Sequence, residues 1–330
     1  MNPGMAILEM FHQAVGQFVP ATELRRVLKE SGGKVTTEIA ELERLGYTIE
    51  SHPHFGYRLL GGPDRLTADD IKARFKAGVI GAEILVFEET ASTNDVVDHL
   101  GKSGAREGLV VFAESQTKGR GRLGRAWASP RRKGLWFSVL LRPKLASSAA
   151  SRLTVAASVA VARTIRQRCG VNARIKWPND VMVNGRKLAG ILVETKSGAA
   201  PRSSGPVDYL ILGIGIDVNC VAADFPPAVA EIATSIRIET GRDQDRLALA
   251  ADLLKALDES YQMALTDFEA VADEWARLCS TLGGQIAVTL GRRRVEGFAQ
   301  ALDADGALLL RKDNGQIERI LGGELAVERA

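Results

Sequence analysis

The chain is 330 residues long, 45% hydrophobic and 25% charged, which is the composition of an ordinary globular protein with two or three domains. The formal net charge of +3 excludes a protein-wide basic field that would hold nucleic acid or a membrane surface non-specifically. Three cysteines without Cys-x-x-Cys spacing argue against a zinc site and favour a reducing compartment. With no apolar run of about 18 residues and no signal-peptide pattern, the sequence predicts a cytoplasmic protein without a membrane partner.

Residues 1–62 show the order of elements typical of a winged helix-turn-helix domain. Apolar residues recur at helical spacing in three successive segments, and two short strand patterns then enclose a turn-rich stretch. The third helix ends before Gly46, and Thr36 or Thr37 would cap its start. Because the third helix of such a domain enters the major groove of DNA, the candidate DNA-binding residues are Lys34, Thr36 and Thr37.

The charge of this segment argues against strong DNA binding. Residues 1–62 hold six Lys or Arg and seven Glu, a net charge of −1, and the third helix offers mainly Glu38, Glu41 and Glu43. Neutralisation of phosphates supplies most of the non-specific affinity for DNA. The alternative is a module that packs on the rest of the protein or mediates contact between two copies.

A run of turn-forming residues, Gly61-Gly62-Pro63-Asp64, marks the end of this segment. We predict a linker over 63–83 and a central domain of mixed strands and helices over 84–280. A C-terminal domain over 281–330 follows, where short strand patterns are separated by Gly and Asp turns.

The segment 116–127, Gln-Thr-Lys-Gly-Arg-Gly-Arg-Leu-Gly-Arg-Ala-Trp, sets three arginines and a lysine among three glycines. Glycine allows a ligand to approach the backbone closely, so this composition predicts an anion-binding loop. Its Gly-x-Gly-x-x-Gly spacing also matches the dinucleotide-binding fingerprint, which must open a helix and precede an acidic residue by about 20 positions. Here Pro130 and a strand pattern over 135–141 follow instead, so that interpretation fails.

Two further polar motifs flank the loop in the sequence. Ser92-Thr93-Asn94 precedes a helical pattern and reads either as a helix cap, with Asp95 at capping-box spacing, or as a polar ligand site at a helix start. Downstream of an amphipathic helix over 148–168, the turn Asn184-Gly185 predicts a hairpin. This hairpin brings Lys187 near Asp180, and a lysine between an Asp and an Arg-rich loop is a candidate phosphate ligand.

In combination these motifs carry a family resemblance. The segment 118–130, the motif Lys-Trp-Pro-Asn-Asp at 176–180 and the motif Gly-Arg-Lys-Leu-Ala-Gly-Ile-Leu-Val-Glu at 185–194 resemble, in order and interval, those of biotin–protein ligases. The resemblance extends to the two-function subtype that is also the biotin operon repressor. It implies an α+β multidomain protein: a winged helix-turn-helix over 1–62, a mixed α/β biotin/lipoate-ligase-type catalytic domain, and an SH3-like β-barrel over 281–330.

The activity implied by the resemblance is that of a biotin–[biotin carboxyl-carrier protein] ligase. Biotin and ATP form biotinyl-5′-AMP, with Mg²⁺ bridging the phosphates, and biotin passes to a lysine of biotin carboxyl carrier protein. The partners implied are that carrier protein, operator DNA and a second copy in a homodimer. The residues implied to be catalytic are Lys187, Arg122 and Asp180. Those implied to bind biotin are Ser92, Thr93, Asn94, Gln116, Arg120, Gly121, Arg122 and Lys187. Those implied to bind the nucleotide are Lys118, Arg120, Arg122, Arg125, Trp127, Asn179 and Lys187.

Two departures from the family pattern leave alternatives open. The third helix is more acidic than a repressor's reading helix, and Asp217 stands where the family tends to have Asn. The chain could instead be a lipoate-type ligase, which shares the adenylation chemistry, or a biotin-sensing DNA-binding regulator without turnover. Biotin is favoured over lipoate by the form of the Gly-Arg loop.

Overall fold

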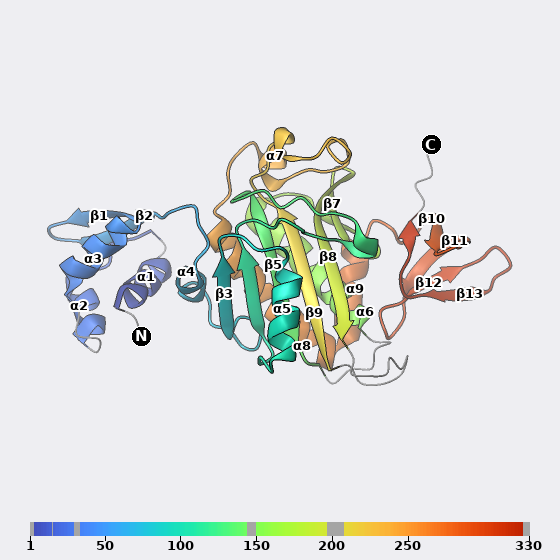
Figure 1. The fold of residues 1–330 in the computed structure, drawn as a ribbon, viewed down its shortest axis with the longest axis horizontal. Helices are drawn as coiled ribbons and strands as arrows, with labels where there is room; N and C mark the ends of the chain where they lie inside the picture. Colours follow the sequence, from blue (N-terminus) through green and yellow to red (C-terminus); the bar gives the residue numbers. More distant parts are fainter. Residues whose placement is uncertain (1–2, 15, 30–33, 144–149, 197–207, 326–330) are drawn as a thin grey trace. The chain divides into compact units, whose positions relative to one another are not determined.

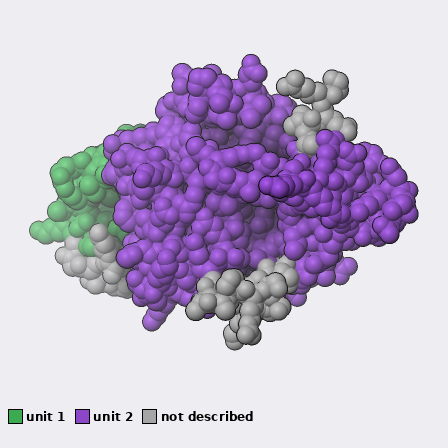
Figure 2. Space-filling model, turned by 45° about the vertical axis from the view of Figure 1, so that its right-hand side comes forward, with its two compact units in different colours: residues 1–76, 245–251 green, residues 77–244, 252–330 purple. Residues whose placement is uncertain are grey.

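The computed structural model describes residues 3–14, 16–29, 34–143, 150–196 and 208–325. The chain divides into two compact units, which Figure 2 distinguishes by colour. Unit 1 consists of residues 1–76 and 245–251, and unit 2 of residues 77–244 and 252–330.

Unit 1 contains three helices, a hairpin and a short fourth helix (Figure 1). Their bounds are α1 (Pro3–Gln13), α2 (Ala21–Lys29), α3 (Val35–Arg44), β1 (Thr48–His52), β2 (Gly56–Gly61) and α4 (Ala68–Lys72). The three long helices meet in one apolar core, in which Ile7, Leu24 and Leu42 are fully or almost fully buried. The predicted order of three helices and a hairpin is therefore present.

The predicted start of α3 is wrong. The residue before the helix is Lys34, with φ of −103° and ψ of 131°, and no side chain caps the helix. Val35 already lies in the core at 7% exposure, so burial of this side chain draws the first turn forward. Thr36 and Thr37 consequently lie inside the helix, where they and Lys34 are exposed. The glycines that separate α2 from α3 in the sequence lie outside the described residues.

A buried carboxylate fastens α4 within unit 1. Asp70 has no solvent exposure, accepts a hydrogen bond from the Tyr47 hydroxyl, and lies 2.5 Å from Thr67 Oγ1. Thr67 is the cap of α4, and its hydroxyl accepts from the Asp70 backbone N–H at 3.1 Å. Burial, followed by the bond to Asp70, raises the pKa of Tyr47, which keeps this hydroxyl a donor.

Unit 2 is built on a seven-stranded sheet in the order β3-β4-β5-β9-β8-β7-β6, in which only β3 and β4 are parallel. The strands are β3 (Glu83–Phe87), β4 (Leu109–Ala113), β5 (Gly134–Leu141), β6 (Arg174–Lys176), β7 (Asp180–Val183), β8 (Arg186–Lys196) and β9 (Tyr209–Asp217). The central strands β4 and β5 are buried throughout, as expected for strands that are apolar except for Ser138.

Helices cover both faces of this sheet (Figure 1). Helix α5 (Thr93–Lys102) packs on β4, β5 and β9, whereas α6 (Ser151–Cys169) packs on β6, β7 and β8 and against α9 (Phe268–Leu278). Two more helices are α7 (Ile236–Thr240) and α8 (Arg246–Thr266). Helix α6 ends at Gly170, whose φ of 68° suits a left-handed cap, as predicted; the first predicted residues, 148–149, lie outside the described residues.

The C-terminal segment forms a five-stranded antiparallel sheet in the order β13-β12-β11-β10-β14. Its strands are β10 (Gln285–Leu290), β11 (Arg293–Leu302), β12 (Leu308–Arg311), β13 (Ile317–Ile320) and β14 (Glu324–Leu325). Val288, Ala299 and Leu308 are almost fully buried in it. In the described part of the chain, no helix combines the length and the apolar character needed to cross a bilayer.

We expect unit 1 to lose stability as the pH falls from 6.5 toward 4. Burial, with the charge of Arg74, lowers the pKa of His12 to about 4, against weaker opposition from Asp70 and Asp245. In that pH range unfolded His12 takes up a proton and folded His12 does not, so acid favours unfolding. Hydrogen exchange of unit 1 amides against pH would measure this, and His12→Gln should flatten the dependence. An unchanged pH dependence in the variant would show that other groups cause it.

Candidate functional site

Lys187 and Asp180 face each other across the β7–β8 hairpin. The turn residues Asn184 and Gly185 have φ values of 49° and 77°, the left-handed pair that this two-residue turn requires. Lys187 Nζ lies 2.7 Å from Asp180 Oδ1, as predicted from the hairpin. That oxygen nonetheless receives no well-aligned hydrogen bond from any described residue. The contact is an ion pair held by charge, so an anionic ligand can compete for the ammonium.

Trp127 lies against two glycines on neighbouring strands. Gly190 of β8 and Gly215 of β9 are cross-strand partners. A Cβ on Gly215 would come within 2.6 Å of the indole Nε1, and one on Gly190 within 3.1 Å of the ring. Lys187 Nζ lies 5.1 Å from the ring centroid, within cation–π range. The indole N–H is buried and has no acceptor among the described residues, which leaves a donor for a ligand.

Arg120 is held between two carboxylates. Its Nη1 lies 2.7 Å from Asp95 Oδ1 on α5, and its Nε lies 3.1 Å from Glu194 Oε1 on β8. Burial acts to lower the pKa of Arg120, but hydrogen bonds to Glu194 and Asp95 outweigh it, and the net shift is upward. The first half of the loop is therefore tied to α5 and β8 by a side chain whose charge is already neutralised.

The second half of the loop reaches the C-terminal sheet. Arg122 Nη1 donates to Asn179 Oδ1 and to the Gly323 carbonyl, each at 3.1 Å, and Arg125 forms an ion pair with Glu324 of β14. Burial lowers the pKa of Arg122, although the charges of Asp180 and Glu324 favour the cation. Half-buried and bonded only to neutral oxygens, Arg122 is the cation in this loop best prepared for an anion.

Thr93 and Gln116 form a hydrogen-bonded polar cluster at the start of α5. Gln116 Oε1 accepts from Thr93 N at 2.8 Å and lies 3.1 Å from Thr93 Oγ1, while Gln116 Nε2 donates to Ser129 Oγ at 2.9 Å. Ser92 precedes the helix, yet its buried hydroxyl makes no cap hydrogen bond, so the capping-box interpretation is wrong. The reason is that its partner Asp95 pairs with Arg120.

The remaining predicted residues act mainly through backbone groups. The Lys118 N–H donates to the Ala91 carbonyl at 2.8 Å while its side chain is exposed, and the Gly121 N–H donates to the Arg125 carbonyl at 2.8 Å. These bonds fold the loop back on itself and onto the segment before α5. All of the predicted loop and hairpin residues thus lie around one region of unit 2.

Asp217, at the end of β9, is a buried acid. Burial raises its pKa well above the usual range, partly opposed by a contact from Cys220 Sγ at 3.6 Å and by the charge of Lys187. A raised pKa favours the protonated carboxyl group, which combines an O–H donor with a C=O acceptor as the Asn amide combines an NH2 with a C=O. This explains how an Asp can occupy a position where the family tends to have Asn.

Several residues that position the site's side chains were not predicted from the sequence. Asp95 and Glu194 neutralise Arg120, Ser129 holds Gln116, and Glu324 holds Arg125. A loop with three arginines and no acidic residue needs counterions from elsewhere, and this excess charge was the available signal. Which distant carboxylates supply them depends on the fold.

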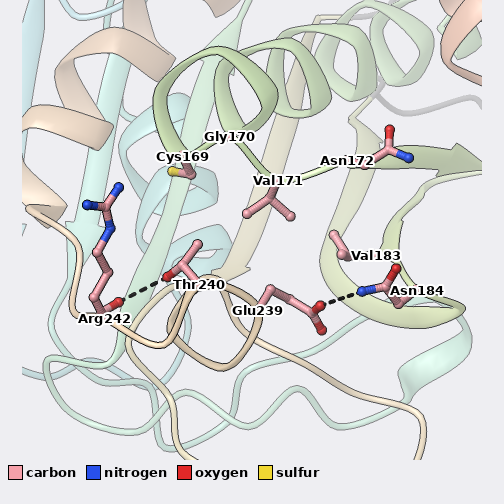
Figure 3. A pocket seen from close by; sticks show the side chains of 9 residues that line it. All are labelled: Cys169, Gly170, Val171, Asn172, Val183, Asn184, Glu239, Thr240 and Arg242. Carbon is pink, nitrogen blue, oxygen red and sulfur yellow. Dashed lines mark hydrogen bonds between the residues drawn. The ribbon is translucent and has the colours of Figure 1, made fainter.

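A separate hollow of about 480 Å³ lies between the end of α6, the β7–β8 turn and α7 (Figure 3). Glu239 crosses its rim, where it accepts from Asn184 Nδ2 at 2.7 Å, and Cys169 and Arg242 also line it. None of the predicted site residues lines this hollow.

Comparisons with known proteins agree with the motifs. A sequence model of the biotin/lipoate A/B protein ligase family matches residues 86–217, and a model of the biotin protein ligase C-terminal domain matches residues 281–326. The chain is 32% identical to the bifunctional ligase/repressor BirA of Bacillus subtilis over 97% of both chains. It is 29% identical to that of Escherichia coli over 96% of this chain and 95% of the other. The solved biotin protein ligase from Aquifex aeolicus, in complex with biotin and ATP, is 29% identical, with a TM-score of 0.62, over 76% of this chain and all of that one.

We expect Gly215→Ala to displace Trp127 and Gly190→Ala to disturb it less. The added methyl group would lie 2.6 Å from the indole in the first case and 3.1 Å in the second, and only the first is closer than real contacts allow. The Trp127 emission, isolated by subtraction of a Trp127→Phe spectrum, should shift to the red in Gly215→Ala. Equal emission in both variants would show that the two glycines do not seat the ring.

Proposed function

This chain belongs to the biotin protein ligase family and is a biotin ligase. We propose that it converts biotin and ATP to biotinyl-5′-AMP and then biotinylates a lysine of biotin carboxyl carrier protein. The observation that carries the proposal is the convergence of Lys187, Asp180 and Trp127 above the glycine pair of β8 and β9. The ammonium can neutralise the anions of the first step, the indole can bound the ligand, and the carboxylate can act as the base of the second step.

The first step joins two anions, because the biotin carboxylate attacks the α-phosphorus of ATP and pyrophosphate leaves. The protein must neutralise and align the two reactants, and it needs no covalent intermediate. Arg122 and Lys187 would hold the carboxylate and the α-phosphate, with Asn179 orienting the Arg122 guanidinium as it does here at 3.1 Å. Lys118 and Arg125, which are exposed, would meet the outer phosphates.

The biotin ring system would lie over Ser92, Thr93, Asn94 and Gln116, whose donors and acceptors suit a ureido group. Trp127 would separate it from the nucleotide. Arg120 would then contribute mainly through its backbone, since Asp95 and Glu194 occupy its side chain. Gly121, beside it, leaves room for the adenylate.

The second step needs a base for the incoming lysine, which is mostly ammonium near neutral pH. Asp180 is the carboxylate next to Lys187 and would accept that proton before the amine attacks the mixed anhydride and AMP leaves. Mg²⁺, when bound with ATP, would supply charge neutralisation at the phosphates. The described residues include no group of three or more His, Cys, Asp or Glu side chains that could hold a metal ion.

The outer parts of the chain fit accessory roles. We propose that residues 1–62 are a winged helix-turn-helix, 63–83 a linker, 84–280 the catalytic domain, and 281–330 an SH3-like barrel. Support comes from the helix and hairpin order of unit 1, the five-stranded C-terminal sheet, and relatives that are named ligase/repressor. The proposal includes operator DNA as a ligand, a homodimer formed through a sheet edge, and a cytoplasmic location.

We expect biotin-dependent exchange of pyrophosphate into ATP, and none that depends on lipoate. Lys187→Ala should lower this exchange by about 100-fold or more, because one preorganised charge is lost where charge develops. Lys102→Ala is the matched control, since Lys102 pairs with Asp98 on the surface of α5. Exchange with lipoate alone would identify a lipoate ligase, and no exchange with either acid would leave a regulator without turnover. A fall in melting temperature at unchanged exchange would make Lys187 structural.

We expect operator DNA to bind weakly, since residues 1–62 have a net charge of −1. If Lys34 contacts a phosphate, Lys34→Ala should reduce the slope of log affinity against log salt by about 0.9. The control is Lys72→Ala at the end of α4. Identical slopes in wild type and Lys34→Ala would remove Lys34 from the interface.

A further inference from the structure

A buried chain of polar groups connects the start of α5 to the middle of β5. Thr93 Oγ1 lies 2.7 Å from Ser138 Oγ, and Ser138 Oγ lies 2.5 Å from Asn94 Oδ1. Ser138 has no solvent exposure, and the other two residues are 2% and 5% exposed. A serine hydroxyl in the centre of an otherwise apolar strand therefore serves two residues of the proposed biotin site.

The distances fix the direction of the hydrogen bonds. A separation of 2.5 Å fits an O–H···O bond and is too short for N–H···O, so Ser138 donates to the carbonyl oxygen of Asn94. The single Ser138 proton is then used, so Ser138 Oγ can only accept from Thr93 Oγ1, whose one proton lies between Ser138 Oγ at 2.7 Å and Gln116 Oε1 at 3.1 Å. This order turns Asn94 Nδ2 away from Ser138, and that nitrogen is buried without an acceptor among the described residues.

The sheet leaves space for this arrangement at one position. Gly213 of β9 is the cross-strand partner of Ser138, and a Cβ on Gly213 would come within 2.4 Å of Asn94 Oδ1. Gly213 and Gly215 are two residues apart and point to the same face, so Asn94 and Trp127 lie above the same side of the sheet. Ser138 binds the Asn94 side chain by a hydrogen bond, and Gly213 leaves the space that this side chain occupies.

We propose that Ser138 is a positioning residue of the biotin-binding site, which orients the Asn94 amide and the Thr93 hydroxyl toward biotin. The proposal rests on the proposed function. Ser138 itself has no solvent exposure, and it acts by directing the Asn94 N–H, a buried donor without an acceptor among the described residues, to an acceptor on the ring system of biotin. A buried donor without a partner is costly, so the ligand that supplies the acceptor is favoured over one that lacks it.

The test is the kinetics of biotin-dependent pyrophosphate exchange in Ser138→Ala. We expect the KM for biotin to rise about 10-fold, the loss expected for one misdirected buried hydrogen bond, with kcat and the KM for ATP unchanged within about 2-fold. In an Asn94→Ala background the same change should cost much less, because Ser138 acts through Asn94.

Two further variants separate positioning from folding. Ser158→Ala removes another fully buried serine hydroxyl, bonded at 2.8 Å to the Val155 carbonyl in α6, and should leave the KM for biotin unchanged. Gly213→Ala displaces Asn94 while Ser138 keeps its hydroxyl, and it should reproduce the rise in KM, even if Ser138→Ala folds poorly. The proposal is overturned if neither Ser138→Ala nor Gly213→Ala raises the KM for biotin, or if kcat falls equally. Absence of biotin-dependent exchange in the wild type would instead overturn the proposed function.

Discussion

The cations of the 116–127 loop need partners when no ligand is bound, and this requirement organises the site. Arg120 takes two carboxylates, Arg125 takes Glu324, and Arg122 takes two neutral oxygens. An exposed ion pair such as that of Arg125 contributes only about 0–1 kcal/mol, so an anion can replace it at little cost. The half-buried Arg122 is paired with no carboxylate of the described residues. Ligand affinity is therefore concentrated at Arg122, and Arg120 remains a tether.

Glycines occupy the sheet positions that lie directly beneath the side chains of the site. Gly190, Gly213 and Gly215 lie where a Cβ would strike Trp127, Lys187 or Asn94. Glycine within a strand lowers its stability because it has no side chain to pack. At these positions the missing side chains leave space above the sheet for the site residues. Trp136 of β5 and Ile214 and Ile216 of β9 are large and buried, which compensates within the same sheet. The same face thereby combines a rigid apolar layer with a polar ligand surface.

Local sequence patterns predicted the elements, and the fold decided their partners. The Asn184-Gly185 turn fixed both the hairpin and the approach of Lys187 to Asp180, because a two-residue turn sets the register. The start of α3 and the cap of α5 were wrong because tertiary contacts overrode short-range rules: Val35 is drawn into the core, and Asp95 is drawn to Arg120. Ser138 could not be predicted, since a serine in an apolar strand carries no signal until Asn94 is placed above it.

Lys187 has two competing partners in the proposed reaction, and this competition orders the two steps. Without ligand its ammonium lies 2.7 Å from Asp180 and near the Trp127 ring, so the carboxylate is already paired with a cation. When the α-phosphate and the biotin carboxylate arrive, their charge draws Lys187 away from Asp180. The released carboxylate is then available to the acceptor lysine. Asp180 would become a base only once an adenylate is in place, when the acceptor lysine can be used.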